Sequence, residues 1–359
     1  LMMFGGLFLR RSAAKYVAII GMLLLFVLNA AELSNGWLLI NIASKGLIRT
    51  GGLSLAFLAV LTAATLLYFL LSGNEMEKIG SPVSEYFALI FFSFCGIALC
   101  CTFNSLLMLF LGVEIMSIPL YVLTGAEKKN IKSNEAALKY FLLGSFSTGI
   151  LLLSIAFIYG ANPHASFNIS DISITQSSLP VLMAAGMVLL LAAMSFKVSA
   201  APFHFWTPDV YDGSPTVFTS YMSTVVKAAA FFAFIRVFEN IFGMYQSEWQ
   251  GLIAVITVAT LFFGNITAVF QVSVKRMLAY SSISQAGFML LSLFALNDHG
   301  KEGLVLYAAA YSFATIGLFA IMMKLDDYTI EGFNGLSSRQ PLLAFAALIF
   351  LLSLTGIPP

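Results

Sequence analysis

The chain has 359 residues, of which 60% are hydrophobic and only 10% are charged, and its mean hydropathy is +0.93. Such values exclude a water-soluble domain of this size, and the net charge of +1 excludes the basic surface that nucleic-acid binding needs. Because open sheets cannot satisfy their edges in lipid, the composition predicts an all-α, polytopic transmembrane helical bundle.

Apolar stretches near the ~20 residues that cross ~30 Å of hydrocarbon follow one another along the chain, separated by short polar loops. We expect one transmembrane domain, 1–359, with about twelve segments, the first and last of them partial because both ends look truncated. The approximate limits of the segments are 1–9, 15–31, 52–72, 86–103, 104–124, 134–160, 180–203, 214–238, 250–271, 276–296, 302–324 and 341–359.

The Lys and Arg residues test this segmentation, because cytoplasmic loops carry the excess of positive charge. Assigning the loops alternately to two sides places eleven of the 18 Lys and Arg residues on one side and four on the other. The first group is Arg10, Arg11, Lys15, Lys78, Lys128, Lys129, Lys132, Lys275, Arg276, Lys324 and Arg339, and the second is Lys45, Arg49, Arg236 and Lys301. We therefore expect the first group to be cytoplasmic. Lys275 and Arg276 most simply set this orientation, with proton uptake as the alternative.

An internal repeat relates segments 134–160 and 302–324 at an offset of 167 residues. The identical positions are Glu135, Tyr140, Ser145, Phe146 and Thr148 in the first and Glu302, Tyr307, Ser312, Phe313 and Thr315 in the second. The two segments run in opposite directions in this topology, which predicts inverted repeats at approximately 86–238 and 250–359. Each repeat would hold a discontinuous helix, broken at Pro202 and at Pro358-Pro359. Such repeats are typical of transporters and ion-translocating proteins.

Two charged residues lie near the middle of apolar segments. Glu114 has about ten residues, or ~15 Å of helix, on either side, and Lys227 is centred in 216–237. Ionisable groups at that depth usually face a partner or a wet cavity and mark an ion pathway. Ser223 and Thr224 could hydrogen-bond water beside Lys227. The alternative for Glu114 is a structural ion pair that locks two helices.

Lys197 precedes a proline that should interrupt its helix. A continuous helix from Val181 to Asp209 would be ~43 Å long, too long for the bilayer. Pro202 would free the carbonyl of Val198 beside the lysine. A charge next to a broken helix is typical of transporter midplane sites, and the alternative is a lysine that snorkels to the headgroups.

Lys139 and His204 are further candidates with open alternatives. Lys139 lies only ~7.5 Å inside its helix, so snorkelling competes with a functional role. His204 could relay protons through its near-neutral pKa or cap the membrane interface.

The residues predict no metal or redox cofactor in this chain. Cys95, Cys100 and Cys101 lie inside one apolar segment and match no metal or haem spacing. No Gly-rich nucleotide loop follows a predicted strand, and no Cys/His cluster could hold haem, flavin or an iron–sulfur cluster.

Three motifs resemble a known family. These are KVSAAPFHFWTPDVYDGSP at 197–215, GVEIMSIPL at 112–120 and EAALKYF at 135–141, and a fourth stretch, KRMLAYSSIS at 275–284, extends the likeness along essentially the whole chain. They resemble the antiporter-like membrane subunits of respiratory complex I, which are related to Mrp-type cation/proton antiporters. The lysine at 227 is similar to that of the N-type subunit, also called subunit 2, where the other paralogues usually have histidine.

The resemblance implies a proton-translocating subunit of NADH:quinone oxidoreductase. It implies that Glu114 and Lys197 form the ion pair of a first half-channel and that Lys227 is the central relay lysine. It also implies a hetero-oligomer with other membrane subunits in a bacterial plasma membrane rather than an organelle membrane. NADH, flavin, iron–sulfur clusters and quinone would belong to the partner subunits. The alternatives are a free-standing Mrp-type Na⁺/H⁺ antiporter subunit and a non-conducting scaffold whose charges only lock helices together.

Overall fold

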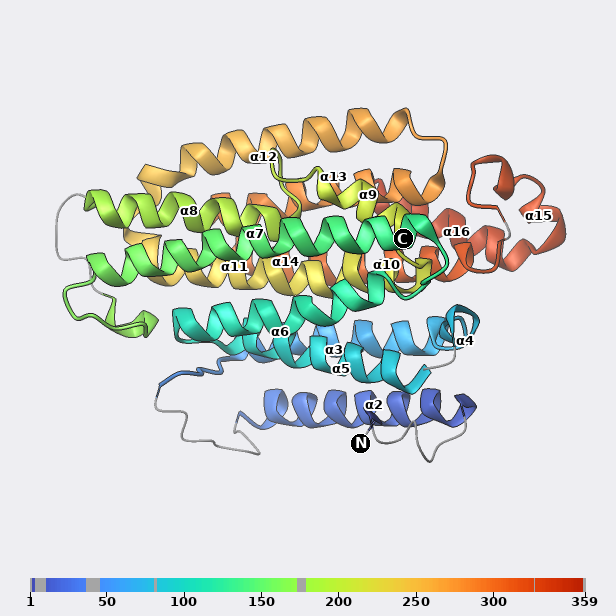
Figure 1. Cartoon of the computed structure of the whole chain (residues 1–359), viewed down its shortest axis with the longest axis horizontal. Helices are drawn as coiled ribbons and strands as arrows, with labels where there is room; N and C mark the ends of the chain where they lie inside the picture. The colour runs from blue at the N-terminus through green and yellow to red at the C-terminus, as the bar shows by residue number, and fades with distance from the viewer. Residues whose placement is uncertain are drawn as a thin grey trace.

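The computed structural model describes residues 2–3, 11–36, 46–80, 83–172, 179–325 and 327–357. Within these ranges the chain forms helices joined by loops. Figure 1 shows the long helices side by side along the long axis of the molecule, from α2 at the bottom to α12 at the top. The all-α transmembrane bundle predicted from composition is confirmed.

The helices of the first part of the chain are α2 (Arg11–Asn35), α3 (Gly52–Ser72), α4 (Met76–Ile79), α5 (Val83–Thr102), α6 (Leu106–Thr124), α7 (Ile131–Ala161), η1 (Ile169–Asp171), α8 (Val181–Val198) and α9 (Trp206–Gly213). Those of the second part are α10 (Thr216–Tyr221), η2 (Met222–Val226), α11 (Lys227–Phe242), η3 (Gly243–Tyr245), α12 (Gln246–Val269), α13 (Val274–Ala295), α14 (Asp298–Met322), η4 (Glu331–Phe333), α15 (Leu336–Arg339) and α16 (Pro341–Leu354).

Each predicted segment from 15–31 onward overlaps one or more helices. Nine stretches of the described chain are long and apolar enough to cross a membrane, and α16 is shorter. One of the nine, Thr216–Val269, has 54 residues. It is this long because α10, η2, α11, η3 and α12 follow one another there without a gap. Most of segment 1–9 and the break at Pro358-Pro359 lie outside the described residues.

The chain breaks between α8 and α9, where the sequence predicted a discontinuous helix. The predicted limit at residue 203 is wrong, because α8 ends at Val198. Ser199 adopts a left-handed conformation (φ 64°), its N–H bonds to the Phe196 carbonyl, and the Ala200 N–H bonds to the Ser195 carbonyl. This is a Schellman termination, which ends the helix at Val198, four residues before Pro202. The proline therefore lies in the connecting loop and does not kink the helix.

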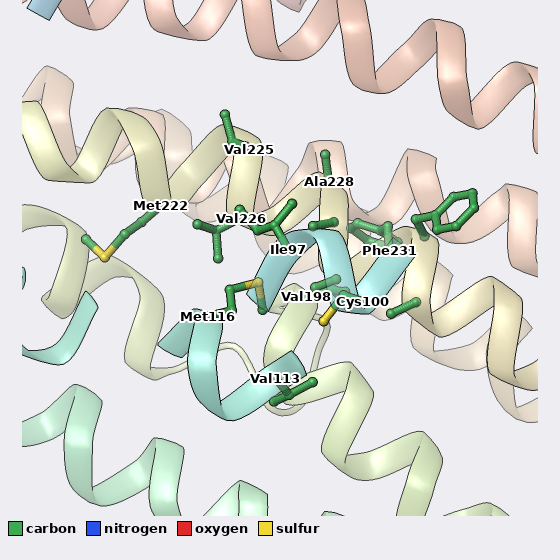
Figure 2. Close-up of a cluster of buried hydrophobic side chains, with 14 of the residues drawn as sticks. Ile97, Cys100, Val113, Met116, Val198, Met222, Val225, Val226, Ala228 and Phe231 are labelled. Atoms are coloured by element: carbon green, nitrogen blue, oxygen red, sulfur yellow. The ribbon is translucent and has the colours of Figure 1, made fainter. Parts of the chain in front are cut away.

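Close packing fixes the relative positions of α5 and α6. A Cβ atom on Gly96 would lie 2.2 Å from the Met116 nitrogen and 2.7 Å from the Gly112 carbonyl oxygen, so the two backbones approach as only glycine allows. Figure 2 shows Ile97, Val113 and Met116 in the apolar cluster that these helices form with α8 and α11. Glu114 thus lies on a helix whose position is set by packing.

The charged ends of the bundle agree with the predicted sorting of lysines and arginines. Lys78 and Lys324 both bind Glu75, Lys15 binds Asn74, and a cleft at the same end is lined by Lys132 and Lys275 among others. Arg49, Arg236 and Lys301, from the second group, line a different cavity, which shares no lining residue with this cleft. Arg10 and Lys45 lie outside the described residues, and the side chain of Arg11 is not described.

Candidate functional site

Lys227 lies at the start of α11, with only 2% of its surface exposed. Its ammonium donates to the main-chain oxygen of Ser282 on α13 at 3.0 Å and to the Ser282 hydroxyl at 2.5 Å. The nitrogen also lies 5.7 Å from the ring centroid of Tyr211 on α9. Among the described residues no carboxylate forms an ion pair with it. The positive charge is held by neutral dipoles and an aromatic face alone.

A π-helical turn, η2, immediately precedes Lys227. Such a turn leaves main-chain carbonyls without their usual helical partners, and it is often found at functional sites. Here the Tyr311 hydroxyl donates to the Ser223 carbonyl at 2.8 Å, and the Tyr211 hydroxyl donates to the Met222 carbonyl at 3.4 Å. Tyrosines from α14 and α9 thereby hold the irregular turn in place.

The hydroxyls predicted to solvate Lys227 bind elsewhere. Ser223 and Thr224 both donate to the Ser220 carbonyl, at 3.3 and 2.6 Å. The sequence analysis missed the role of Ser282 as the partner of the lysine. A signal was present, because Ser282 belongs to the polar stretch 280–285 inside an apolar segment.

Lys197 lies in the last turn of α8, and its side chain reaches α6 inside the bundle. Its ammonium donates to the Ser117 hydroxyl at 2.7 Å, and that hydroxyl donates to the Val113 carbonyl at 2.5 Å. Glu114 lies one turn before Ser117 on the same face of α6. No direct ion pair joins Glu114 and Lys197 among the described residues.

A stack of aromatic rings lies beside this contact. Tyr121, one turn beyond Ser117, meets the ring of Tyr140 edge-on at 4.7 Å, and Tyr140 stacks on Trp206 at 4.9 Å. The Trp206 indole donates to the Phe196 carbonyl at the end of α8. The rings connect α6, α7 and α9 around the end of the helix that carries Lys197.

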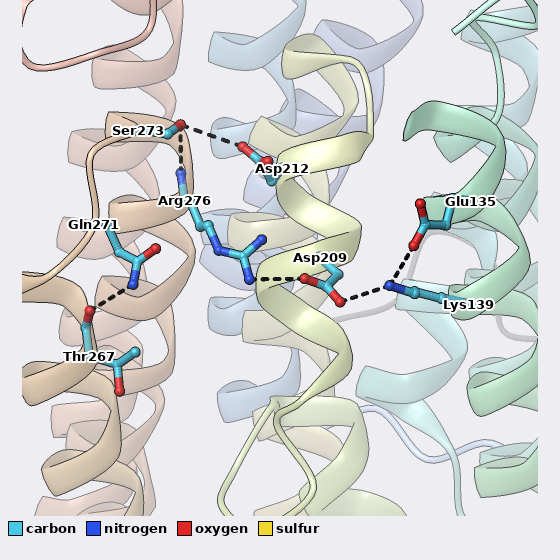
Figure 3. A network of polar contacts seen from close by, with 8 residues as sticks. All are labelled: Glu135, Lys139, Asp209, Asp212, Thr267, Gln271, Ser273 and Arg276. Carbon is cyan, nitrogen blue, oxygen red and sulfur yellow. Dashed lines mark hydrogen bonds and ion pairs between the residues drawn. The ribbon is translucent and has the colours of Figure 1, made fainter. Parts of the chain in front are cut away.

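Lys139 lies in a network of ion pairs, shown in Figure 3. Its ammonium is 2.7 Å from Glu135 and 2.9 Å from Asp209, and Asp209 is 3.0 Å from Arg276. The side chain of Lys139 is 41% exposed. It therefore reaches the surface, as the snorkelling alternative required, and it joins α7, α9 and α13 there. Arg276 belongs to this network, although the sequence analysis predicted for it mainly a role in setting the membrane orientation.

His204 lies in the loop between α8 and α9 and is 6% exposed. Its ring stacks on Phe205 at 4.6 Å and on Phe263 at 6.0 Å. The Nδ1 atom is buried without a hydrogen-bond partner in the structure. The structure does not bring His204 into contact with the buried lysines.

A second polar chain leads from the Lys227 site toward α16. Gln285, one turn beyond Ser282 on α13, accepts a hydrogen bond from the Tyr307 hydroxyl and donates to the Leu354 carbonyl at 2.8 Å. These residues line a pocket of about 150 Å³ together with Tyr311. The pocket lies at the end of α16, close to where the described residues finish.

The arrangement offers proton-carrying groups but no metal cage. Among the residues that the structure describes, no group of three or more His, Cys, Asp or Glu side chains could hold a metal ion. Two ammonium groups in the bundle interior, each held by a serine, are the chemistry that the site provides.

Comparison with known proteins places this geometry in context. A family described as "NADH:quinone oxidoreductase/Mrp antiporter, TM" matches residues 103–359. The chain is 43% identical over 318 residues to NADH-quinone oxidoreductase subunit N of Cytophaga hutchinsonii, covering 88% of this chain and 69% of the relative. Its fold matches a chain of respiratory complex I from Thermus thermophilus with bound aureothin at a TM-score of 0.80 and 31% identity, covering 100% of this chain and 76% of the other. A chain of the Mrp complex from a Dietzia species also has a TM-score of 0.80, with 98% and 67% covered, but at 21% identity that likeness concerns the fold alone.

Proposed function

Because the chain belongs to the family of NADH-quinone oxidoreductase subunit N, a membrane subunit of a proton-translocating enzyme, we propose that its buried lysines relay protons. In this proposal Glu114, Lys197 and Lys227 are the relay groups of a half-channel, and proton movement is coupled to electron transfer from NADH to quinone in partner subunits. The chain acts in a hetero-oligomer with other membrane subunits, in a bacterial plasma membrane. Residues 86–238 and 250–359 would be its inverted repeats.

The observation that carries the proposal is the contact set of Lys227. An ammonium in low dielectric is costly unless a carboxylate compensates it. Among the described residues, the Lys227 ammonium has Ser282 and the Tyr211 ring as its partners. The charged form is therefore held loosely enough to lose its proton when a nearby charge changes.

Lys197 supplies this change of a nearby charge. In this proposal Glu114 favours the charged form of Lys197, whose ammonium is held by Ser117, one turn beyond Glu114 on α6. A rotation of the Ser117 hydroxyl or a shift of the Glu114 side chain would weaken the hold on the Lys197 proton. The proton would then move toward Lys227, and reprotonation would follow through wetted half-channels.

Lys139 and His204 have outer roles in this proposal. The ion pairs of Lys139 with Glu135 and Asp209 hold exchangeable protons at the surface of the bundle. His204 offers a buried, unpaired ring nitrogen in the loop that follows α8. NADH, flavin, iron–sulfur clusters and quinone would be bound by the partner subunits.

A free-standing Na⁺/H⁺ antiporter subunit is the second candidate function, favoured by the fold shared with the Mrp complex. The 43% identity to a subunit N favours the first candidate. Cation exchange by the purified chain without an electron donor would reverse this preference.

The test is Lys227→Ala in the assembled enzyme, in sealed inverted membrane vesicles. We expect NADH-driven proton uptake per NADH to fall sharply, while NADH oxidation by an artificial acceptor stays at the level of the unsubstituted enzyme. Lys129→Ala, which removes one exposed lysine from a loop, is the matched control. Undiminished pumping by Lys227→Ala with normal assembly would exclude the relay role.

A further inference from the structure

A polar cleft of about 580 Å³ opens at the end of the bundle that carries most of the lysines. Its lining includes Lys78, Glu127, Lys132, Asp212, Ser273 and Lys275. We call it the Lys275 cleft. None of these residues belongs to the half-channel of Glu114 and Lys197, which is built on α6 and α8.

Lys275 forms the inner wall of this cleft and is only 5% exposed. Its ammonium donates to the main-chain oxygens of Asp212 at 3.0 Å and Ser214 at 2.5 Å, just at the end of α9. Carbonyls at a helix end carry partial negative charge and hold a cation there. Within the described chain no carboxylate pairs directly with Lys275, and the charged side chains that act on it are Asp212, Glu127 and Lys132.

The same two helices hold Lys227. Tyr211, whose ring faces Lys227, is the residue before Asp212 on α9. Ser282, the hydrogen-bond partner of Lys227, lies seven residues after Lys275 on α13, two turns along the same face, or ~10 Å of rise. Both lysines are thus buried ammonium groups without a carboxylate partner, held by α9 and α13 at successive depths.

We propose that the Lys275 cleft is a second site of proton uptake, which supplies Lys227 without passing through Lys197. The Lys275 ammonium gives one proton to the neutral Lys227 amine through the Ser282 hydroxyl and water admitted from the cleft. The neutral Lys275 amine then takes one proton from hydronium in the cleft, so charge and protons balance in each cycle. This inference rests on the proposed relay role of Lys227.

The test compares Lys275→Arg with Lys275→Met in the assembled enzyme, in sealed inverted vesicles. Arginine can still donate to both carbonyls at the end of α9, but it does not release its proton. We therefore expect Lys275→Arg to assemble normally and still pump fewer protons per NADH than the unsubstituted enzyme. Lys275→Met should show the same loss of pumping. Lys129→Met, a change of one exposed lysine outside the cleft, is the matched control.

The outcomes separate this inference from the proposed function. Full pumping by Lys275→Arg would overturn the inference, since Lys275 would then only cap α9. Full pumping by Lys227→Ala would overturn the proposed function itself. Loss of pumping in Lys227→Ala with full pumping in Lys275→Arg would leave the relay intact and remove the second uptake site.

A chemical block covers the case in which both Lys275 variants fail to assemble. Asp212, partly exposed in the cleft, is changed to cysteine and treated with a membrane-impermeant sulfonated thiol reagent from the cytoplasmic face. We expect pumping to fall with the extent of labelling, whereas the unsubstituted enzyme treated in parallel keeps its pumping. Complete labelling of Asp212→Cys without loss of pumping would overturn the inference.

Discussion

The amide nitrogen of Gln285 donates to the main-chain oxygen of Leu354 at 2.8 Å, which joins the middle of α13 to the end of α16. The amide oxygen of the same residue accepts from Tyr307 on α14. Gln285 is 6% exposed. Removing its side chain would therefore leave the Leu354 carbonyl and the Tyr307 hydroxyl without these hydrogen bonds. This one residue connects three helices next to the Lys227 site.

We expect Gln285→Leu to destabilise the enzyme by about 1–3 kcal/mol, the cost of leaving buried polar groups without partners. The change is measured as a lower midpoint of thermal inactivation of the detergent-solubilised complex. Gln250→Leu is the control, since Gln250 makes a comparable 3.1 Å bond to the Phe294 carbonyl at an exposed position. Equal midpoints for both variants would show that Gln285 does not hold α16.

Ser117→Ala tests the serine that holds Lys197 one turn from Glu114 on α6. Loss of a hydrogen bond to a charged group costs about 1.5–3 kcal/mol, or roughly 10- to 100-fold in the equilibrium that the bond controls. We expect the protonation of Lys197 to depend more strongly on Glu114 and the rate of NADH-driven pumping to fall. Ser93→Ala, which removes a buried 2.9 Å bond to the Met116 carbonyl on the same helix pair, should leave the pumping rate unchanged. A normal rate in Ser117→Ala would remove Ser117 from the relay.

The helices could be predicted from the sequence because each is a local apolar stretch, and the predicted segment 104–124 is an example, since α6 spans Leu106–Thr124. The contact between Lys197 and Ser117 could not be predicted, because it spans 80 positions and depends on how α6 and α8 rotate against each other. The direct ion pair implied by family resemblance therefore did not appear. The π-helical turn before Lys227 has no periodicity signal, and the Ser199 termination replaced the break expected at Pro202. The inverted repeats stay a prediction.

Gly96→Val should prevent stable assembly. A Cβ atom at this position would lie 2.2 Å from the Met116 nitrogen, and main-chain atoms cannot move aside as a flexible side chain can. Overpacking of this kind costs about 1–3 kcal/mol or more. The measurement is the amount of subunit in membranes, and Gly149→Val on α7, where nothing lies within 4 Å, is the control. Normal amounts of Gly96→Val protein would contradict the close packing of α5 on α6.

Acidification should weaken the contact between α4 and the end of α14. Burial raises the pKa of Glu75, but Lys324 and Lys78 outweigh it and hold the pKa below its ordinary value of 4.5. A lowered folded-state pKa means that the ionised carboxylate stabilises the fold above pH 4.5 and that this contribution, about 1 kcal/mol, is lost as the pH falls below it. Thermal inactivation of the unsubstituted enzyme and Glu75→Gln should therefore differ at pH 7 and converge toward pH 4. A constant difference over that range would show that the pair adds no pH-dependent stability.

Lys139→Gln separates a surface role from a role in the central relay. The side chain is 41% exposed and shares Asp209 with Arg276, so its ion pairs contribute about 0–1 kcal/mol to stability and assembly should be normal. If Lys139 only delivers protons to the surface of the bundle, the pumping rate falls while the number of protons per NADH is preserved. Arg276→Gln removes the other partner of Asp209 and should give the same pattern. If protons per NADH fall in Lys139→Gln as far as in Lys227→Ala, Lys139 belongs to the central relay, because a group that only speeds proton delivery to the surface changes the rate and not that ratio.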